Sequence, residues 1–460
     1  MLPQTGCAAF DRDFAAIFKI ATRQAGTAEE LEKMLEELYE AIFNVDLKAY
    51  DSAELQAEAT LVMRATFDLH IKLRQRLADW EKRGLVSKEA ESRLRAVFRA
   101  MRYAADMLGE LTIGYDQMDP GEKPYRAFTG PHNNTFILPG YAAEDGQAVT
   151  FQSGDVIVVR GLIHNSAAIA RIGDLDSQFS HVAMIHVDGK GRHRVLEALM
   201  EEGATISSLD YTLEHRLARA VLYRHRDCDV AARAADRMYE RIKASRAFSG
   251  KHIFYDFTME LDNYKDLFCS KVIREGFDRA SGGLIMLPTH PTEFRLAPED
   301  FIKRIGVTAE ESFAPGDMEL ETQFTMVAEW RDFRKTSRVR LMDLVMVKLF
   351  EWMDRGYVFK PTFSIRMLSS AAKASGYLPN ILKNMLAFAV PKIPSNMSMN
   401  AIEAIAMLHE TAEPIYQALH AAELKAIKET GRPMHPRDVY AYLDAFEKEA
   451  GGQIGYLRKT

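Results

Sequence analysis

The hydrophobic pattern changes its period along this chain, and that change limits the fold more than any other feature. Residues 10–112 place apolar side chains at helical spacing, for example in TAEELEKMLEELYEAI at 27–42. From residue 154 the runs become short and strand-like, in DVIVVR, HVAMIHVD, HRVLEALM and RAVLYRHR. Helical spacing returns from about residue 336. A strand-rich middle between helical ends predicts an α+β protein.

Four regions follow from this pattern. The stretch 113–153 is rich in Gly, Pro, Asn and Asp, as in DPGEKP and GPHNN, which is typical of loops. After the strands we expect a helix over 229–245 with Asp229 as its N-cap, and another that begins near Cys269. The predicted regions are an N-terminal helical hairpin or bundle (1–112), a loop-rich connector (113–153), an α+β region (154–335) and a C-terminal helical region (336–460).

The composition limits the partners that we expect. The net charge is −6 and no basic stripe stands out, so nucleic acid is not an expected partner. No run of about 18 apolar residues is present, so no transmembrane span is expected. The cysteines Cys7, Cys228 and Cys269 form neither a disulfide framework nor a CxxC pair that would bind structural zinc.

Two segments leave the location of the protein open. The start, MLPQTGCAAF, lacks a basic and an apolar region and is no secretory signal as it stands. QTGC is nevertheless similar to the end of a bacterial lipoprotein signal, which makes Cys7 a lipidation candidate. If Met1 is the true start we expect a cytoplasmic protein, and if an upstream signal is missing, a lipoprotein of the cell envelope. The apolar stretch 379–393 fits peripheral membrane association or, as we favour, a buried helix.

Cys269 stands where an apolar approach gives way to a helical pattern, in KDLFCSKVIREGF at 265–277. Free backbone N–H groups and the positive dipole end of a helix stabilise a thiolate there. The same N–H groups can bind the oxyanion that forms when the thiolate attacks a carbonyl. A free cysteine is more often buried and inert, and we interpret Cys228, which lacks such a context, as structural.

A histidine and a carboxylate lie on two consecutive predicted strands, joined by GKG at 189–191. If the turn has three residues, opposite positions sum to 380, and His181 and Glu197 lie diagonally on one face of the sheet, about 7–8 Å apart at Cα. A two-residue turn would put them on opposite faces. His186 has the other parity and is the weaker candidate for a base.

The motifs SGDVIVVRG, FSHVAMIHVD, VLEAL and YDFTMELDNYKDLFCSKVI resemble, in this order, the circularly permuted branch of the NlpC-type papain-like cysteine hydrolases, and most closely its YiiX-like proteins. In that branch a histidine and a polar residue precede the cysteine, as His181 and Glu197 precede Cys269 here. The likeness covers roughly residues 150–300. It implies a small antiparallel sheet packed on the cysteine-bearing helix, with the region 154–335 as the catalytic domain.

The resemblance further implies a role for each residue of the site. It makes Cys269 the nucleophile, His181 the general base and Glu197 the residue that orients the base. Tyr255 matches a position near the nucleophile, and Tyr255 and Ser270 are candidates for binding the substrate or the oxyanion. Neither a metal nor an organic cofactor is expected.

The function that we predict is that of a cysteine hydrolase that cleaves an amide bond, in a peptide of the cell-wall type. A second interpretation is a lipid-directed acyltransferase or thioesterase of the lecithin:retinol acyltransferase type, which should have a long apolar tunnel in place of an open polar groove. A third is an inactive papain-like scaffold or binding protein. The expected substrate is therefore a peptide or a small acylated or lipid molecule, and the sequence leaves the oligomeric state open.

Overall fold

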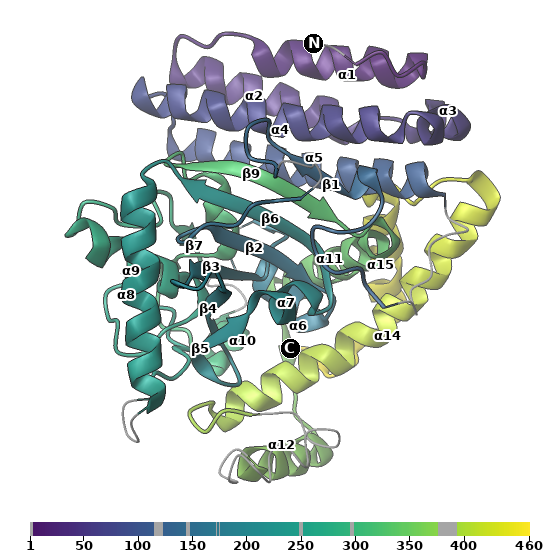
Figure 1. The fold of residues 1–460 in the computed structure, drawn as a ribbon. Coiled ribbons are helices and arrows are strands. Elements are labelled where there is room, and N and C mark those ends of the chain that lie inside the picture. The colour runs from purple at the N-terminus through teal and green to yellow at the C-terminus, as the bar shows by residue number, and fades with distance from the viewer. Residues whose placement is uncertain are drawn as a thin grey trace.

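The fold is built around one antiparallel sheet with helices packed on it (Figure 1). The computed structural model describes residues 3–114, 123–143, 148–171, 173, 175–247, 252–294, 299–375 and 393–460. Helices lie before, within and after the strand-rich middle of the chain. The predicted α+β class is therefore confirmed.

The central sheet has seven strands in the order β1-β9-β6-β2-β3-β4-β5. All four runs predicted to be strands are strands, and each neighbouring pair is antiparallel. The bounds are β1 Thr135–Ile137, β2 Val156–Gly161, β3 His181–Val187, β4 His193–Leu199, β5 Gly203–Ser208, β6 Leu217–His225 and β9 Phe324–Arg331.

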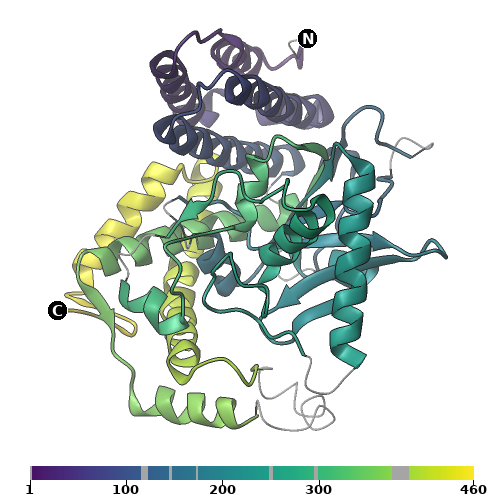
Figure 2. The ribbon, with the colours of Figure 1, turned by 90° about the vertical axis from the view of Figure 1, so that its left-hand side faces the viewer.

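Two long helices cover one face of this sheet, α8 (Cys228–Ala247) and α9 (Cys269–Ser281) (Figures 1 and 2). The α9 helix packs against β3 and β4 through its buried apolar side and ends at Gly282, whose φ of 65° favours glycine. The predicted N-cap of α8 is wrong. The carboxylate of Asp227, one residue before the helix, accepts the Val230 amide at 2.9 Å, while Asp229 lies inside the first turn.

The N-terminal helices stack in layers beside the sheet (Figure 1). Buried ion pairs join these helices to the sheet. Asp106 of α5 binds Arg331 of β9 at 2.7 Å and also pairs with Arg219 of β6. These helices are α1 Ala8–Thr22, α2 Ala28–Phe43, α3 Ser52–Ala57, α4 Ala59–Lys82 and α5 Lys88–Ile113.

The connector contains a strand that the sequence did not predict. β1 pairs with β9, with Phe136 opposite Glu329. A three-residue strand that finds its partner nearly two hundred residues later leaves no periodic signal in its own sequence. The short elements in and between the other regions are α6 His164–Ala170, α7 Leu209–Glu214, β7 Thr292–Glu293, α10 Glu299–Ile305 and β8 Glu311–Ser312, with 3-10 turns at Leu47–Ala49, His132–Asn134 and Pro315–Glu319.

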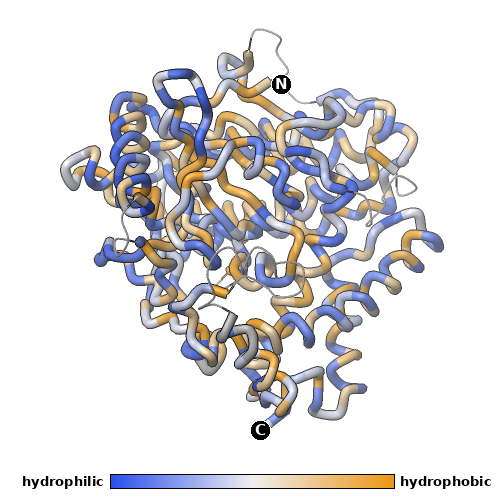
Figure 3. The backbone as a smooth tube through the Cα atoms, turned by 60° about the horizontal axis from the view of Figure 1, so that its bottom comes forward, coloured by the Kyte–Doolittle hydropathy of each residue, from blue (hydrophilic) through white to orange (hydrophobic). Residues whose placement is uncertain are grey.

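The C-terminal part is mainly helical but also forms a small three-stranded sheet, which corrects the purely helical prediction. Most of the apolar stretch 379–393 lies outside the described residues, so neither interpretation of it is tested. Hydrophilic and hydrophobic positions alternate along the outer helices (Figure 3). Within the described residues, no helix combines the length and the apolar character needed to span a membrane. The elements are α11 Phe333–Asp354, β10 Tyr357–Phe359, α12 Phe363–Ser375, α14 Met399–Thr430, α15 Pro436–Glu449, β11 Gln453–Ile454 and β12 Leu457–Lys459.

Candidate active site

The imidazole of His181 and the carboxylate of Glu197 are hydrogen-bonded, with Nε2 2.8 Å from Oε2. The strands β3 and β4 pair with Met184 opposite Leu196, so opposite positions sum to 380 and the predicted register is confirmed. The three-residue turn closes with the Asp188 amide bonded to the Arg192 carbonyl. Register and parity therefore bring the two side chains to one place.

Glu197 is held in its ionised form by its neighbours. It is 3% exposed, and the Ser207 hydroxyl on the adjacent strand β5 donates to its second oxygen. Burial raises the pKa of Glu197, but the hydrogen bonds from His181 and Ser207 outweigh burial and lower it. Because the Glu197 carboxylate occupies Nε2 of His181, the other ring nitrogen, Nδ1, remains available to interact with a third group.

Cys269 is the first residue of α9 and is 6% exposed. Phe268, which precedes it, makes no side-chain capping bond, and the first amide that turns back to the Phe268 carbonyl is that of Lys271, at 3.1 Å. The amides of Cys269 and Ser270 thus stand at the open end of the helix, where N–H groups lack intrahelical acceptors. The buried Ser270 hydroxyl lies 3.9 Å from the Cys269 sulfur.

Cys269 and His181 shift each other's proton affinity. Burial raises the pKa of Cys269, but the His181 imidazole, the Val182 amide and the Ser270 hydroxyl together lower it below the ordinary value. Burial lowers the pKa of His181, but its interactions with Cys269 and Glu197 outweigh burial and raise it to about 10. Both shifts favour the charged pair, a thiolate beside an imidazolium, over the neutral thiol and imidazole.

An open cleft of about 520 Å³ leads to this pair. His181, Glu197, Cys269 and Tyr255 all line it, with further walls from α6, α7 and the end of β2. A cavity of this size can hold a small substrate, since ligand sites are commonly about 300–1,000 Å³. The nucleophile candidate is therefore buried yet reachable from one side.

The comparisons with known proteins bear on the same part of the chain. Residues 150–299 match the family described as permuted papain-like amidase enzyme, YaeF/YiiX, C92 family. This segment, about a third of the chain, is similar to the permuted papain-like amidases. The protein is accordingly an enzyme of the cysteine amidase or peptidase type, as its resemblance to YiiX-like proteins implied. No curated protein and no solved structure gave a significant match.

The amidase segment places His186 away from the cleft, as its parity predicted. Its Nε2 lies 3.0 Å from Asp236 of α8, and its ring stacks on Tyr239 with centroids 4.3 Å apart. His186 therefore contacts α8 on the other face of the sheet. Cys228 is exposed at the start of α8 rather than packed inside, and it lines no part of the cleft.

Tyr255 lies in the strand-like approach to α9 of the amidase, where it bridges to Leu267. It is buried, and burial and the nearby Cys269 charge raise its pKa well above the ordinary value, so its hydroxyl keeps its proton. Its backbone carbonyl accepts the Asn396 side-chain amide at 2.8 Å. This contact was not predictable from local sequence patterns, because Asn396 lies far along the chain in the C-terminal region.

Cys7, the lipidation candidate, is 1% exposed and packs among the N-terminal helices. A lipid chain on its sulfur would require this end of the chain to unpack, and lipidation stays a prediction. Among the described residues, no group of three or more His, Cys, Asp or Glu side chains could hold a metal ion. The expectation that the amidase needs no metal also stays a prediction.

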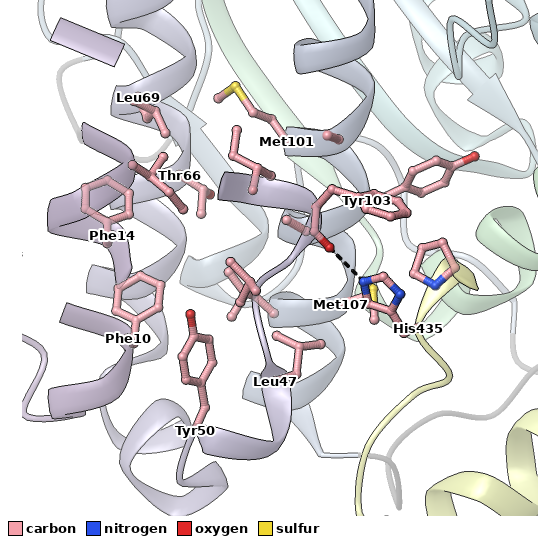
Figure 4. A pocket seen from close by; sticks show the side chains of 18 residues that line it. Phe10, Phe14, Leu47, Tyr50, Thr66, Leu69, Met101, Tyr103, Met107 and His435 are labelled. Carbon is pink, nitrogen blue, oxygen red and sulfur yellow. Dashed lines mark hydrogen bonds between the residues drawn. The ribbon is translucent and has the colours of Figure 1, made fainter. Parts of the chain in front are cut away.

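A separate apolar cavity of about 80 Å³ lies between the N-terminal helices and the start of α15 (Figure 4). Phe10, Phe14 and Met101 line it, and at its rim His435 Nε2 is 2.7 Å from the Phe43 carbonyl. None of the candidate catalytic residues of the amidase lines this cavity. It is a packing feature of the helical layers rather than a part of the cleft.

Proposed function

We propose that Cys269, His181 and Glu197 act as nucleophile, general base and orienting carboxylate in the hydrolysis of an amide bond. The observation that carries this proposal is the 2.8 Å contact of Glu197 with His181 beside a cysteine at the open end of a helix. A nucleophile, a base and a group that orients the base are the three parts that covalent amide hydrolysis requires.

In the first half-reaction the Cys269 sulfur forms a bond to the carbonyl carbon of the substrate. The developing oxyanion accepts hydrogen bonds from the backbone N–H groups of Cys269 and Ser270, and the Tyr255 hydroxyl is a further donor at the same cleft. The carbon–nitrogen bond then breaks as the imidazolium of His181 gives its proton to the leaving amine. The products are a thioester on Cys269 and a free amine.

In the second half-reaction water replaces the amine. Neutral His181 takes a proton from the water molecule, and the water oxygen forms a bond to the thioester carbon. The carbon–sulfur bond breaks, the acid leaves as a carboxylate after losing its proton, and the thiolate–imidazolium pair is restored. Glu197 keeps the imidazole oriented and stabilises its charged form throughout.

The substrate class that we propose is a peptide amide, such as those of cell-wall peptides. Support comes from the cleft, which is open and carries polar side chains. Amide and hydroxyl groups of this kind recognise a peptide backbone through hydrogen bonds. The polar residues that line it, besides the catalytic set and Tyr255, are Asn165, Ser166, Ser180, Glu201, Tyr211, Thr212, His215 and Arg216.

The test is labelling with a cysteine-directed activity probe at neutral pH. The full chain should react at Cys269, and Cys269→Ala should abolish the specific label. Cys228→Ala is the matched control, because Cys228 is exposed and accounts for background reaction. His181→Ala should lower the labelling rate by about 100-fold, the scale of general base contributions. Labelling that survives in Cys269→Ala and disappears in Cys228→Ala would rule out the assigned nucleophile.

A further inference from the structure

A second, apolar cavity of about 90 Å³ adjoins the cleft at Cys269. The two cavities meet there, because five residues line both. None of the described residues that line the apolar cavity is charged, whereas His181, Glu197 and Arg216 all line the cleft. A substrate bound across Cys269 would therefore meet a polar space on one side and an apolar one on the other. The shared residues are Asn165, Ile169, Met200, Tyr255 and Cys269.

The position of His181 decides which part of the substrate enters which space. A general acid must reach the leaving nitrogen within hydrogen-bond distance. His181 lines the cleft but not the apolar cavity, so the leaving amine lies in the cleft. The group that stays on the sulfur as the thioester then extends to the other side, into the apolar cavity.

Part of the wall of the apolar cavity comes from outside the segment that matches the family, since nine of the 21 residues that line it lie beyond residue 299. Phe301 and Ile305 of α10 and Ile405 and Leu408 of α14 line it. Of these, Leu408 is 1% exposed and packs in the core of the C-terminal region. The part of the chain beyond residue 299 therefore shapes the space beside the nucleophile.

We infer that this cavity is the acyl subsite, and that the preferred substrate is an amide whose acyl group bears a short apolar chain. This inference rests on the proposed function. Engineered cavities of about 150 Å³ hold benzene, so a cavity of about 90 Å³ fits a smaller aliphatic group such as a butanoyl chain or a side chain of similar size. The long acyl chain of a membrane lipid exceeds it.

The experiment uses the full chain and para-nitroanilides that differ only in the acyl group: acetyl, butanoyl, succinyl and palmitoyl. The kcat/KM for the butanoyl amide should exceed that for the acetyl amide by about tenfold, because two more methylenes are buried. The succinyl amide, whose chain ends in a carboxylate, should be turned over more slowly than the butanoyl amide by at least as much. The palmitoyl amide should show no gain over butanoyl.

Leu408→Phe fills the cavity and should lower the ratio of butanoyl to acetyl kcat/KM by about tenfold. Leu424→Phe makes the same change at an exposed position of the same helix, where Leu424 is 53% exposed, and should leave the ratio unchanged. Thermal unfolding shows whether each variant folds. If Leu408→Phe does not fold, the acyl series on the unaltered chain decides the question by itself.

The outcomes separate the acyl subsite from the proposed function. Hydrolysis that depends on Cys269 but is equal for acetyl, butanoyl and succinyl amides would overturn the acyl subsite and leave the proposed function in place. A steady gain up to palmitoyl would also overturn it, in favour of a lipid substrate. No hydrolysis of any amide, with Cys269 still alkylated by iodoacetamide, would overturn both.

Discussion

The ammonium of Lys271 lies 2.6 Å from the carboxylate of Asp256, and the Lys271 side chain is fully buried. Lys271 follows Cys269 by two residues on α9, and Asp256 follows Tyr255 in the approach to that helix. Asp256 also accepts the amide and hydroxyl of Thr258. This ion pair therefore ties the segment that carries Tyr255 to the helix that begins at Cys269.

Replacing Lys271 by methionine should destabilise the protein by about 3 kcal/mol, because it leaves a mostly buried carboxylate without its cation. Denaturant unfolding measures the change. Lys265→Met, at an exposed position of the same segment, is the control and should change the free energy of unfolding by less than about 0.5 kcal/mol. An equal effect of both substitutions would show that the ion pair contributes nothing specific.

The thiolate of Cys269 should persist below the pH at which an ordinary cysteine ionises. In a Cys228→Ala background, the rate of alkylation by iodoacetamide should stay high at neutral pH, since His181 lowers the pKa of Cys269. In the His181→Ala variant burial acts without that compensation, so the midpoint of the profile should move to or above the usual value of about 8.5. Identical profiles with and without His181 would contradict the pairing.

The pH profile of kcat/KM should have an acidic limb and a basic limb, both set by the coupled ionisation of Cys269 and His181. As the pH falls through the lowered pKa of Cys269, the thiolate is protonated and kcat/KM should fall. As the pH rises through about 10, His181 loses the proton that the leaving amine requires, and kcat/KM should fall again. A profile that keeps rising between pH 7 and 9 with a slope of one would indicate an unassisted thiol instead.

For catalysis, the negative charge of Glu197 should matter more than the hydrogen bond that Glu197 accepts from Ser207. Glu197→Gln keeps a partner for His181 but removes the charge that raises the His181 pKa, and we expect kcat/KM to fall by about 100-fold or more. Ser207→Ala removes only one hydrogen bond to the carboxylate and should cost about tenfold or less. If both variants lose the same activity, Glu197 acts through the fold of the sheet rather than on the imidazole.

Local rules predicted the part of the site that lies on consecutive strands. The alternation of side chains and the length of one turn were enough to place His181 beside Glu197, because both depend only on residues within a single hairpin. The helix start at Cys269 was visible for the same reason. What the sequence missed comes from distant segments: the contact of Asn396 with Tyr255 and the Leu408 wall join positions separated by more than a hundred residues.

The fold shows the same division. The four runs of alternating or apolar character became β2, β3, β4 and β6, whereas the edge strand β1 has only three residues and the edge strand β5, GATISS, carries little pattern of its own. Asp229 was predicted as a cap from residue type alone. Asp227 also fits that preference, and the choice between them depends on the exit of β6, which one-dimensional periodicity does not describe.

The pairing of β6 with β9 has a practical consequence for anyone who would express the matched segment by itself. All nine residues of β6 are buried, and Phe324–Arg331 covers its outer edge, although this strand lies beyond residue 299. A protein truncated at that residue would present a long, otherwise buried strand edge with unpaired backbone groups, which is a template for intermolecular strand addition. Inclusion bodies are the expected result, and a soluble catalytic fragment has to extend at least through Arg331.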